Sequence, residues 1–313
     1  MKMMNTIAIF GDLLYDCFIW SDRLPRLGET VTGYASGFFA SGKGGNQAVV
    51  CAKLGANALM LGKVGTDERG AFILQTMREN GVKVDGVLAD PETPTGTDCV
   101  MVADGGKNLI VVAPNANARI TAPEVDAMRP YFEQAGSALF QLQVNADAVA
   151  RAMKLARDCG CTVILNPAPA CEVPDEMFAL ADYVTPNETE AEFFTGILRE
   201  GIPLEDWCVR AAEALHQRGA AKLIITLGEF GAYYSDGVRK FSMPAFQVDA
   251  VDSTAAGDAF NGGLAVRLAA GDDITDAMRY ASACGALTAT RRGSVPSLPD
   301  DREVLAFLKK HPI

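Results

Sequence analysis

The stretch Asp252-Ser-Thr-Ala-Ala-Gly-Asp258, which leads into an apolar helical pattern over 259–270, does most to decide the fold and chemistry of this chain. Small residues at a helix start leave backbone N–H groups without partners, and the positive end of the helix dipole adds to their attraction for anions. Asp258 places a carboxylate in that anion-attracting turn. It can be a favourable helix-start charge only, or a general base beside a transferring phosphoryl group.

Outward from this turn, short apolar strand patterns alternate with helical patterns along most of the chain. The strand patterns cover 6–10, 58–64, 138–141, 162–165, 183–185 and 222–226, and the helical patterns cover 45–54, 67–80, 146–158 and 204–218. This order predicts a doubly wound α/β fold with a mostly parallel sheet flanked by helices.

Two stretches interrupt the alternation. Segments 13–40 and 97–112 are rich in aromatic, β-branched and glycine residues and lack helical periodicity. The second predicts a hairpin of 97–103 and 108–112, turned through Asp104-Gly-Gly-Lys107. Kinase lids exclude water from the reaction, and ribbons inserted between parallel units suit that role. We therefore expect one α/β domain over residues 1–313, with a small β lid formed by these two segments.

Composition excludes several classes of function. The net charge of −11 disfavours a nucleic-acid partner, because duplex binding needs a basic patch. No window approaches the roughly 20 apolar residues of a membrane-spanning helix, so we expect no membrane partner and a cytoplasmic protein. With only two histidines and no CxxC pair, a histidine metal site or a Ser-His-Asp triad is excluded.

The common nucleotide-binding loops are absent from the sequence. Ser41-Gly-Lys-Gly-Gly-Asn46 contains a Gly-Lys pair, but Gly44 stands where a Walker A loop needs Ser or Thr. One interpretation is a glycine-rich turn that caps the following helix. The other is close approach of the backbone to a ligand, with Asn46 as donor and acceptor.

Several ordered motifs together resemble the ribokinase family of phosphofructokinase-B-type carbohydrate kinases. Gly42-Lys-Gly-Gly-Asn46 and the turn 252–258 resemble its two signatures. Four further segments agree in order and spacing: Asn166-Pro-Ala-Pro-Ala170, Thr185-Pro-Asn-Glu-Thr-Glu-Ala191, Ile225-Thr-Leu-Gly228 and Thr290-Arg-Arg-Gly293. The resemblance extends from about Ile7 to Leu308 and implies an ATP-dependent sugar kinase with a primary hydroxyl as acceptor.

The resemblance also implies roles for individual residues. Asp258 matches the general base, and the anion hole matches Ala255, Ala256 and Gly257, where the family often has Gly at the first position. The ATP-binding positions are Asn187, Glu190, Thr226, Gly228, Gly231, Gly257 and Ser282. Asn187 and Glu190 match a motif that orders Mg²⁺ and the triphosphate, although the same spacing forms a purely structural capping box. A K⁺ site is implied at Asp252, Thr254, Thr288, Arg291, Gly293 and Ser297, whose alternative is ordinary turn formation.

The implied acceptor pocket departs from the family pattern. Asp16, Gly42, Lys43, Asn46 and Gln143 match sugar-binding positions, but Leu14 stands where the family usually has Asn, and Gln143 where it usually has Glu. Asp98, in the predicted lid, occupies a usually apolar position and could reach an unpaired hydroxyl. D-Ribose is the leading acceptor implied.

Other acceptors and functions remain open at this point. Another sugar, such as a deoxy or branched sugar or a ketohexose, and a nucleoside are alternative acceptors. A sugar-binding regulator that has lost catalysis is disfavoured by the presence of Asp258. The family's lid ribbons often pair, which implies a homodimer.

Overall fold

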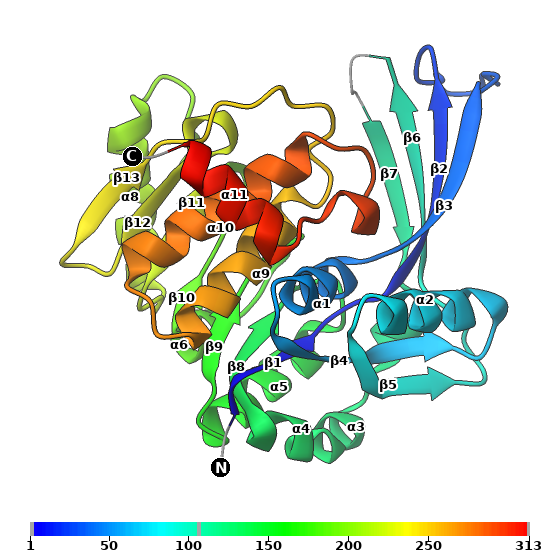
Figure 1. The fold of residues 1–313 in the computed structure, drawn as a ribbon, viewed down its shortest axis with the longest axis horizontal. Helices are drawn as coiled ribbons and strands as arrows, with labels where there is room; N and C mark the ends of the chain where they lie inside the picture. The colour runs from blue at the N-terminus through cyan, green and yellow to red at the C-terminus, as the bar shows by residue number, and fades with distance from the viewer. Residues whose placement is uncertain (1–2, 105–107, 312–313) are drawn as a thin grey trace.

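The computed structural model describes residues 3–104 and 108–311, and its main feature is a nine-stranded sheet with helices on both faces (Figure 1). Its strands follow the order β13-β12-β11-β10-β9-β8-β1-β4-β5. The seven from β11 to β5 pair in parallel, and β12 and β13 form an antiparallel edge. The strands are β1 (Met3–Phe10), β4 (Asn57–Gly65), β5 (Lys83–Asp90), β8 (Ala135–Phe140), β9 (Thr162–Leu165), β10 (Tyr183–Val184), β11 (Leu223–Thr226), β12 (Ala232–Ser235) and β13 (Lys240–Met243).

Strand alternation explains the two helical layers. In β1, Ile7 and Ile9 belong to the hydrophobic core on one face of the sheet, whereas Ala8 and Phe10 belong to the core on the other face. A strand that is apolar on both faces must be shielded from water on both faces, and the two layers of helices provide this burial. The predicted doubly wound α/β fold is confirmed.

The helices divide between these two cores. One layer contains α1 (Lys43–Lys53), α2 (Glu68–Glu79), α9 (Ala256–Ala269), α10 (Ile274–Ala289) and α11 (Asp301–Lys310). The other contains α3 (Ala122–Ala127), α4 (Arg129–Gln134), α5 (Ala146–Asp158), α6 (Asp175–Leu180), α7 (Glu188–Thr195) and α8 (Leu204–Gln217). Within the described ranges, no helix combines the length and apolar character needed to cross a membrane.

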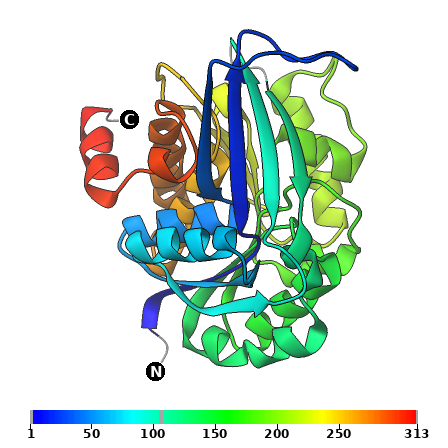
Figure 2. The same cartoon turned by 90° about the vertical axis from the view of Figure 1, so that its right-hand side faces the viewer.

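A second, four-stranded sheet stands beside the main sheet, as Figure 2 shows. Its order is β3-β2-β6-β7, from β2 (Leu14–Ser21), β3 (Ala35–Ser41), β6 (Thr97–Ala103) and β7 (Asn108–Ala113). These strands lie in the segments predicted to form a lid, and β6 and β7 pair as the predicted hairpin. The predicted turn includes Gly105, Gly106 and Lys107, which lie outside the described residues.

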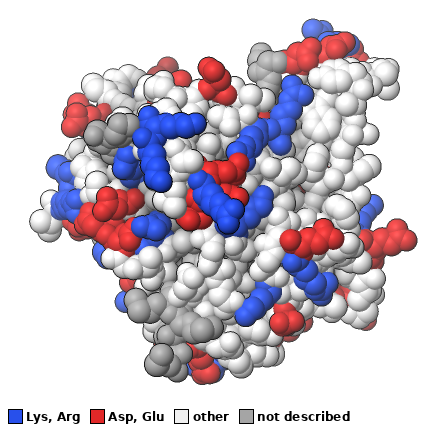
Figure 3. Space-filling view, viewed as in Figure 1, with Lys and Arg blue, Asp and Glu red and all other residues white. Residues whose placement is uncertain are grey.

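One predicted boundary needs correction. The helix after the turn 252–258 begins at Ala256, three residues before the predicted start, because Ala255 adopts a left-handed conformation with φ of 60° and ends the turn there. Asp258 therefore lies inside the first helical turn. On the face in Figure 3, basic and acidic side chains are interspersed.

Candidate active site

The candidate site lies where parallel strands end, which is the usual ligand position in open α/β sheets. The segments after β9 and β10 and the end of β11 meet there with the N-termini of α1, α7 and α9. A hollow of about 190 Å³ occupies this position. It is lined by Lys43, Asn166, Ala168, Thr185, Asn187, Glu190, Thr226, Ser253, Ala255, Gly257, Asp258 and Asn261.

Asp258 is one of two buried carboxylates in the hollow, with Glu190, and each has a relative exposure of 7%. Asn46 Nδ2 donates to Asp258 Oδ2 at 2.9 Å, and Gln47 Nε2 donates to Asp258 Oδ1 at 3.0 Å. Burial raises the pKa of Asp258, while Lys43 and the two amide donors oppose the rise. The carboxylate is thus oriented from two sides and is more basic than an exposed aspartate, as a general base requires.

A chain of buried amides fixes the groups behind Asp258. Gln141 Nε2 donates to Gln47 Oε1 at 2.5 Å, and Gln47 Nε2 also lies 3.1 Å from Asn166 Oδ1. Thr185 Oγ1 donates to Asn261 Oδ1 at 2.5 Å, and Asn261 Nδ2 donates to the Gly257 carbonyl at 2.9 Å. Together these bonds connect the ends of β8, β9 and β10 to α1 and α9.

The turn before Asp258 supplies backbone N–H groups to the hollow. Ala255 and Gly257 line it, and a Cβ at Gly257 would meet no atom within 4 Å, so this backbone is open to a ligand. Ala256 N–H donates to the Ser253 carbonyl at 3.2 Å, a long bond that engages one of the three predicted anion-hole amides. Ala255 and Gly257, which line the hollow, remain the candidate donors for an oxyanion.

Asn187 and Glu190 form the capping box that the sequence allowed. Asn187 N–H donates to Glu190 Oε2 at 2.8 Å, and Glu190 N–H donates to Asn187 Oδ1 at 2.9 Å. Both side chains also line the hollow. Burial raises the pKa of Glu190, opposed by its hydrogen bond from Asn187 and by Lys43. The capping box therefore does not prevent Asn187 and Glu190 from facing a cation bound through water in the hollow.

The predicted K⁺ positions lie in the turn that starts at Asp252, in the last turn of α10, which contains Thr288, and in the segment 291–297 that follows. Asp252 joins two segments, since its carboxylate accepts from Thr254 N–H and from Gly293 N–H, each at 2.9 Å. The Arg291 side chain is paired with Glu303 at 2.6 Å, so only its backbone carbonyl could reach an ion. The Thr288 and Ser297 hydroxyls donate to backbone carbonyls and keep lone pairs.

This donor set contains oxygen atoms only, which suits a hard monovalent cation. Among the described residues, no group of three or more His, Cys, Asp or Glu could hold a metal ion, so a carboxylate-rich divalent site is not formed there.

At the lid end of the site, two carboxylates lie side by side. Asp16 in β2 and Asp98 in β6 face each other in parallel register, and both are buried, with relative exposures of 3% and 8%. Each has one oxygen, Oδ1, without a partner among the described residues. Burial and the neighbouring Asp98 raise the pKa of Asp16 to about 9, and burial raises that of Asp98 to about 6. Because two buried carboxylates side by side repel each other when both are ionised, retention of one proton by the pair is favoured.

The other predicted sugar-binding residues come from β2 and from the segments that follow β3 and β8. Leu14 is buried two positions before Asp16 and so shares its face of β2. Gly42 has φ of 96°, and a Cβ there would lie 2.8 Å from the Asp12 carbonyl, so only glycine allows this approach. Gln143 is half-buried just after β8.

The predicted nucleotide-binding residues divide into two groups. Thr226 lines the hollow with Asn187, whereas Gly228, Gly231 and Ser282 do not. Gly228 and Gly231 have φ of 53° and 100° and shape the turn after β11, and a Cβ at Gly231 would meet the Met243 carbonyl at 2.0 Å. Ser282 Oγ lies 3.9 Å from Met243 Sδ. These residues border the turn beyond the hollow.

Sequence reasoning missed Asp12 and the glutamines behind Asp258. Asp12 is fully buried, accepts Gly44 N–H on Oδ1 at 2.9 Å, and leaves Oδ2 unpartnered among the described residues. Burial raises its pKa to about 6, opposed by Gly44 and Lys43. The available signal was a charged residue, Asp12, that follows the apolar strand 6–10 after a single glycine. Gln47 and Gln141 gave none, because isolated glutamines carry no spacing pattern.

Known proteins provide the remaining evidence. A family model described as pfkB family carbohydrate kinase matches residues 4–301. The chain belongs to this family. It is a carbohydrate kinase in the sense of that family, which confirms the resemblance drawn from its motifs.

Three relatives illustrate the similarity. The chain is 36% identical over 305 residues to the ribokinase of Bacillus subtilis, covering 97% of this chain and 100% of that protein. It is 32% identical over 303 residues to the deoxyribokinase of Salmonella typhimurium, covering 96% and 98%. The structure of Arabidopsis thaliana ribokinase complexed with ribose and ATP matches with a TM-score of 0.87 and 28% identity, covering 97% and 98%.

Proposed function

We propose that this protein transfers the γ-phosphoryl group of ATP to the primary hydroxyl of a small sugar, with D-ribose as the leading acceptor. The observation that carries the proposal is the buried Asp258 carboxylate, which lies at the N-terminus of α9 beside the Gly257 backbone and Lys43. A base, an anion-attracting turn and a cation in one small hollow are the parts that phosphoryl transfer requires.

The chemistry follows from this geometry. Asp258 accepts the proton of the acceptor hydroxyl, whose oxygen bonds to the γ-phosphorus while the bond from that phosphorus to the β,γ-bridging oxygen breaks. Backbone N–H groups of Ala255 and Gly257 and the dipole of α9 stabilise the negative charge on the transferred group. Asn187 and Glu190 would position Mg²⁺ through water, and that ion neutralises charge on the triphosphate.

The lid end would bind the sugar. Asp16 and Asp98 together offer acceptors and one shared proton to neighbouring hydroxyls, and Asn46 presents an unpartnered Oδ1 beside Asp258. We further propose that residues 1–313 act as one domain, that the four-stranded sheet closes as its lid in the cytoplasmic enzyme, that K⁺ binds at the Asp252 loop, and that two copies pair.

Deoxyribose is a second candidate acceptor because of Leu14. A buried leucine offers no partner to a hydroxyl, and leaving a hydroxyl unpaired costs about 1–3 kcal/mol, whereas a deoxy carbon would pack there. The similarity to a deoxyribokinase agrees with this chemistry.

A coupled assay of ADP release tests the proposal. The purified enzyme is supplied with Mg²⁺, K⁺ and ATP, and with D-ribose, 2-deoxyribose, ketohexoses or branched sugars in turn. We expect D-ribose to give the highest kcat/KM. A tenfold higher value for another sugar would replace ribose but keep the kinase. Release of ADP no faster than the sugar-free rate with every acceptor would overturn the proposed function.

A further inference from the structure

The two buried carboxylates of the lid, Asp16 and Asp98, here called the lid pair, have no cation beside them. Neither forms an ion pair within the described ranges. The groups that act on Asp16 are Asp98, the more distant Asp12 and the Ser41 hydroxyl, which donates a hydrogen bond to it. Buried charges in proteins are normally paired or neutralised. The lid pair therefore needs either a retained proton or a cation that arrives with a ligand.

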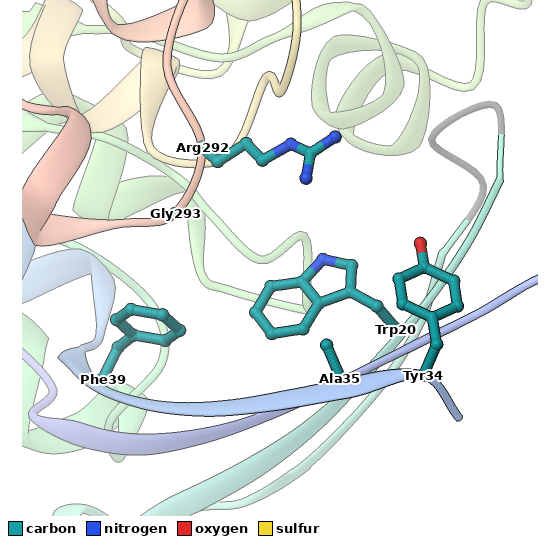
Figure 4. A pocket seen from close by; sticks show the side chains of 6 residues that line it. All are labelled: Trp20, Tyr34, Ala35, Phe39, Arg292 and Gly293. Carbon is teal, nitrogen blue, oxygen red and sulfur yellow. The ribbon is translucent and has the colours of Figure 1, made fainter. Parts of the chain in front are cut away.

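Two basic side chains of this region act elsewhere. Lys43 lines the hollow, where it opposes the rise in the pKa of Asp258. Arg292 reaches over the Trp20 indole from the loop after α10, as Figure 4 shows. Trp20 lies four residues beyond Asp16 in β2, which is about 13 Å along the strand. The two cations thus serve the base and the far end of the lid.

The lid pair belongs to the same site as the proposed general base. Asp12 interacts electrostatically with both Asp16 and Asp258. The segment that joins β3 to α1 also contacts both, since Ser41 donates to Asp16 and Asn46 donates to Asp258. A small acceptor with its primary hydroxyl at Asp258 would therefore direct its remaining groups toward the lid pair.

The unpartnered buried atoms at this end of the site are acceptors. Among the described residues, one oxygen each of Asp12, Asp16, Asn46 and Asp98 is buried without a hydrogen-bond partner. A hydroxyl group donates one hydrogen bond, whereas an ammonium group donates three and accepts none. A positive charge between two buried carboxylates would also replace the proton that they retain. An ammonium group therefore fits this end of the site better than a hydroxyl does.

We propose that the lid pair binds an ammonium group, so that the acceptors of this kinase include sugars in which an amino group replaces a hydroxyl away from the phosphorylated carbon. The inference rests on the proposed function, because the transfer is unchanged: Asp258 takes the proton of the primary hydroxyl, that oxygen bonds to the γ-phosphorus, and ADP leaves. The ammonium group keeps its three protons and donates to Asp16 and Asp98, while the proton that the lid pair held passes to solvent.

The probes are 2-amino-2-deoxy-D-ribose and 3-amino-3-deoxy-D-ribose, each of which differs from D-ribose by one amino group. ADP release with Mg²⁺, K⁺ and ATP gives kcat/KM for each sugar. A hydrogen bond to a charged group changes affinity by about 10- to 150-fold. We expect at least one amino sugar to exceed D-ribose, the leading neutral acceptor, by about tenfold or more. Turnover of D-ribose with neither amino sugar above it would overturn the inference and leave the proposed function intact.

Replacement of Asp98 by Asn tests the charge with little change of shape. It removes one carboxylate from the lid pair, so kcat/KM for the amino sugar, divided by that for D-ribose, should fall about tenfold or more. The matched control is Asp104→Asn, which removes an exposed carboxylate just beyond β6 and should keep the ratio. A ratio that is the same in Asp98→Asn as in the wild type would overturn the inference.

Binding calorimetry of the wild type without ATP tests the lid pair independently of turnover. Burial and the neighbouring Asp98 raise the pKa of Asp16, so the empty pair holds a proton near neutral pH. Titrations at neutral pH in buffers of different ionisation enthalpy should show release of about one proton with the amino sugar and none with D-ribose. Equal proton exchange with both sugars, or no measurable binding of either amino sugar, would overturn the inference whatever the catalytic activity.

Discussion

Replacement of Asp258 by Asn separates a general base from a helix-start charge. Loss of a general base typically costs about 10²–10⁴-fold in rate, or roughly 3–5 kcal/mol of transition-state stabilisation. Loss of a favourable charge in a first helical turn costs only about 0.3–1 kcal/mol of stability and should leave turnover unchanged. The two interpretations therefore differ by about a hundredfold or more in kcat, well beyond the error of an assay.

The contacts of Asp258 also set the effect on folding. Its two oxygens accept from Asn46 and Gln47, so an asparagine would keep one of these bonds and turn its own N–H₂ toward the other donor. An unmade buried bond costs about 1–3 kcal/mol, which removal of a buried charge partly offsets. We expect a folded variant whose melting temperature shifts by a few degrees.

The measurement is ADP release from D-ribose and ATP, together with sugar and ATP binding by calorimetry. Asp273→Asn is the matched control, because Asp273 also begins a helix and asparagine caps equally well there. Asp258→Asn should bind both substrates and turn over at least a hundredfold more slowly, while Asp273→Asn keeps full activity. Wild-type turnover by a correctly folded Asp258→Asn would refute the general-base role.

Four shorter predictions concern the rest of the site. Exchange of Na⁺ for K⁺ at constant ionic strength should raise kcat, and Asp252→Ala should abolish the response; full activity in Na⁺ alone would contradict a K⁺ site. Leu14→Asn should lower the KM for D-ribose about fivefold or more, and an unchanged KM would place no hydroxyl there. Glu190→Gln preserves the capping box and should keep the melting temperature while lowering kcat about 10- to 100-fold, whereas unchanged kcat would leave a purely structural role. The folded pKa values of Asp16 and Asp98 lie above those of the unfolded chain, so stability should fall as pH rises from about 4 to 9, less steeply in Asp98→Asn; parallel melting-temperature profiles would argue against the coupled pair.

Local patterns predicted most of the fold. The strand 162–165 and the helix 146–158 have the predicted bounds, since each combines a clear periodicity with turn residues at its ends. The antiparallel edge of β12 and β13 was not predicted, because Ala-Tyr-Tyr-Ser and Lys-Phe-Ser-Met mix polar and apolar residues and lack the apolar run that marks β9.

The motifs located Asp258 and its turn, but the arrangement around them depends on the tertiary fold. Asp16 and Asp98 meet only because β2 and β6, about eighty residues apart, pair in parallel, and no local signal reports such register. The bonds from Gln47 to Asp258 and Gln141 likewise join separate elements. The sequence therefore identified polar residues that would need hydrogen-bond partners, but it could not predict which distant residues those partners are.

Because side chains of α1 hold Asp258 in place, the enzyme can turn over substrate only after its N-terminal and C-terminal parts have folded together. The two amides that orient this carboxylate come from Asn46 and Gln47, more than two hundred residues earlier in the chain. During synthesis, α1 would emerge long before Asp258. Neither the N-terminal nor the C-terminal part of the chain alone would contain an oriented carboxylate. If the chain were divided at the exposed Gly201, in the connection between α7 and α8, activity would appear only when the two fragments associate.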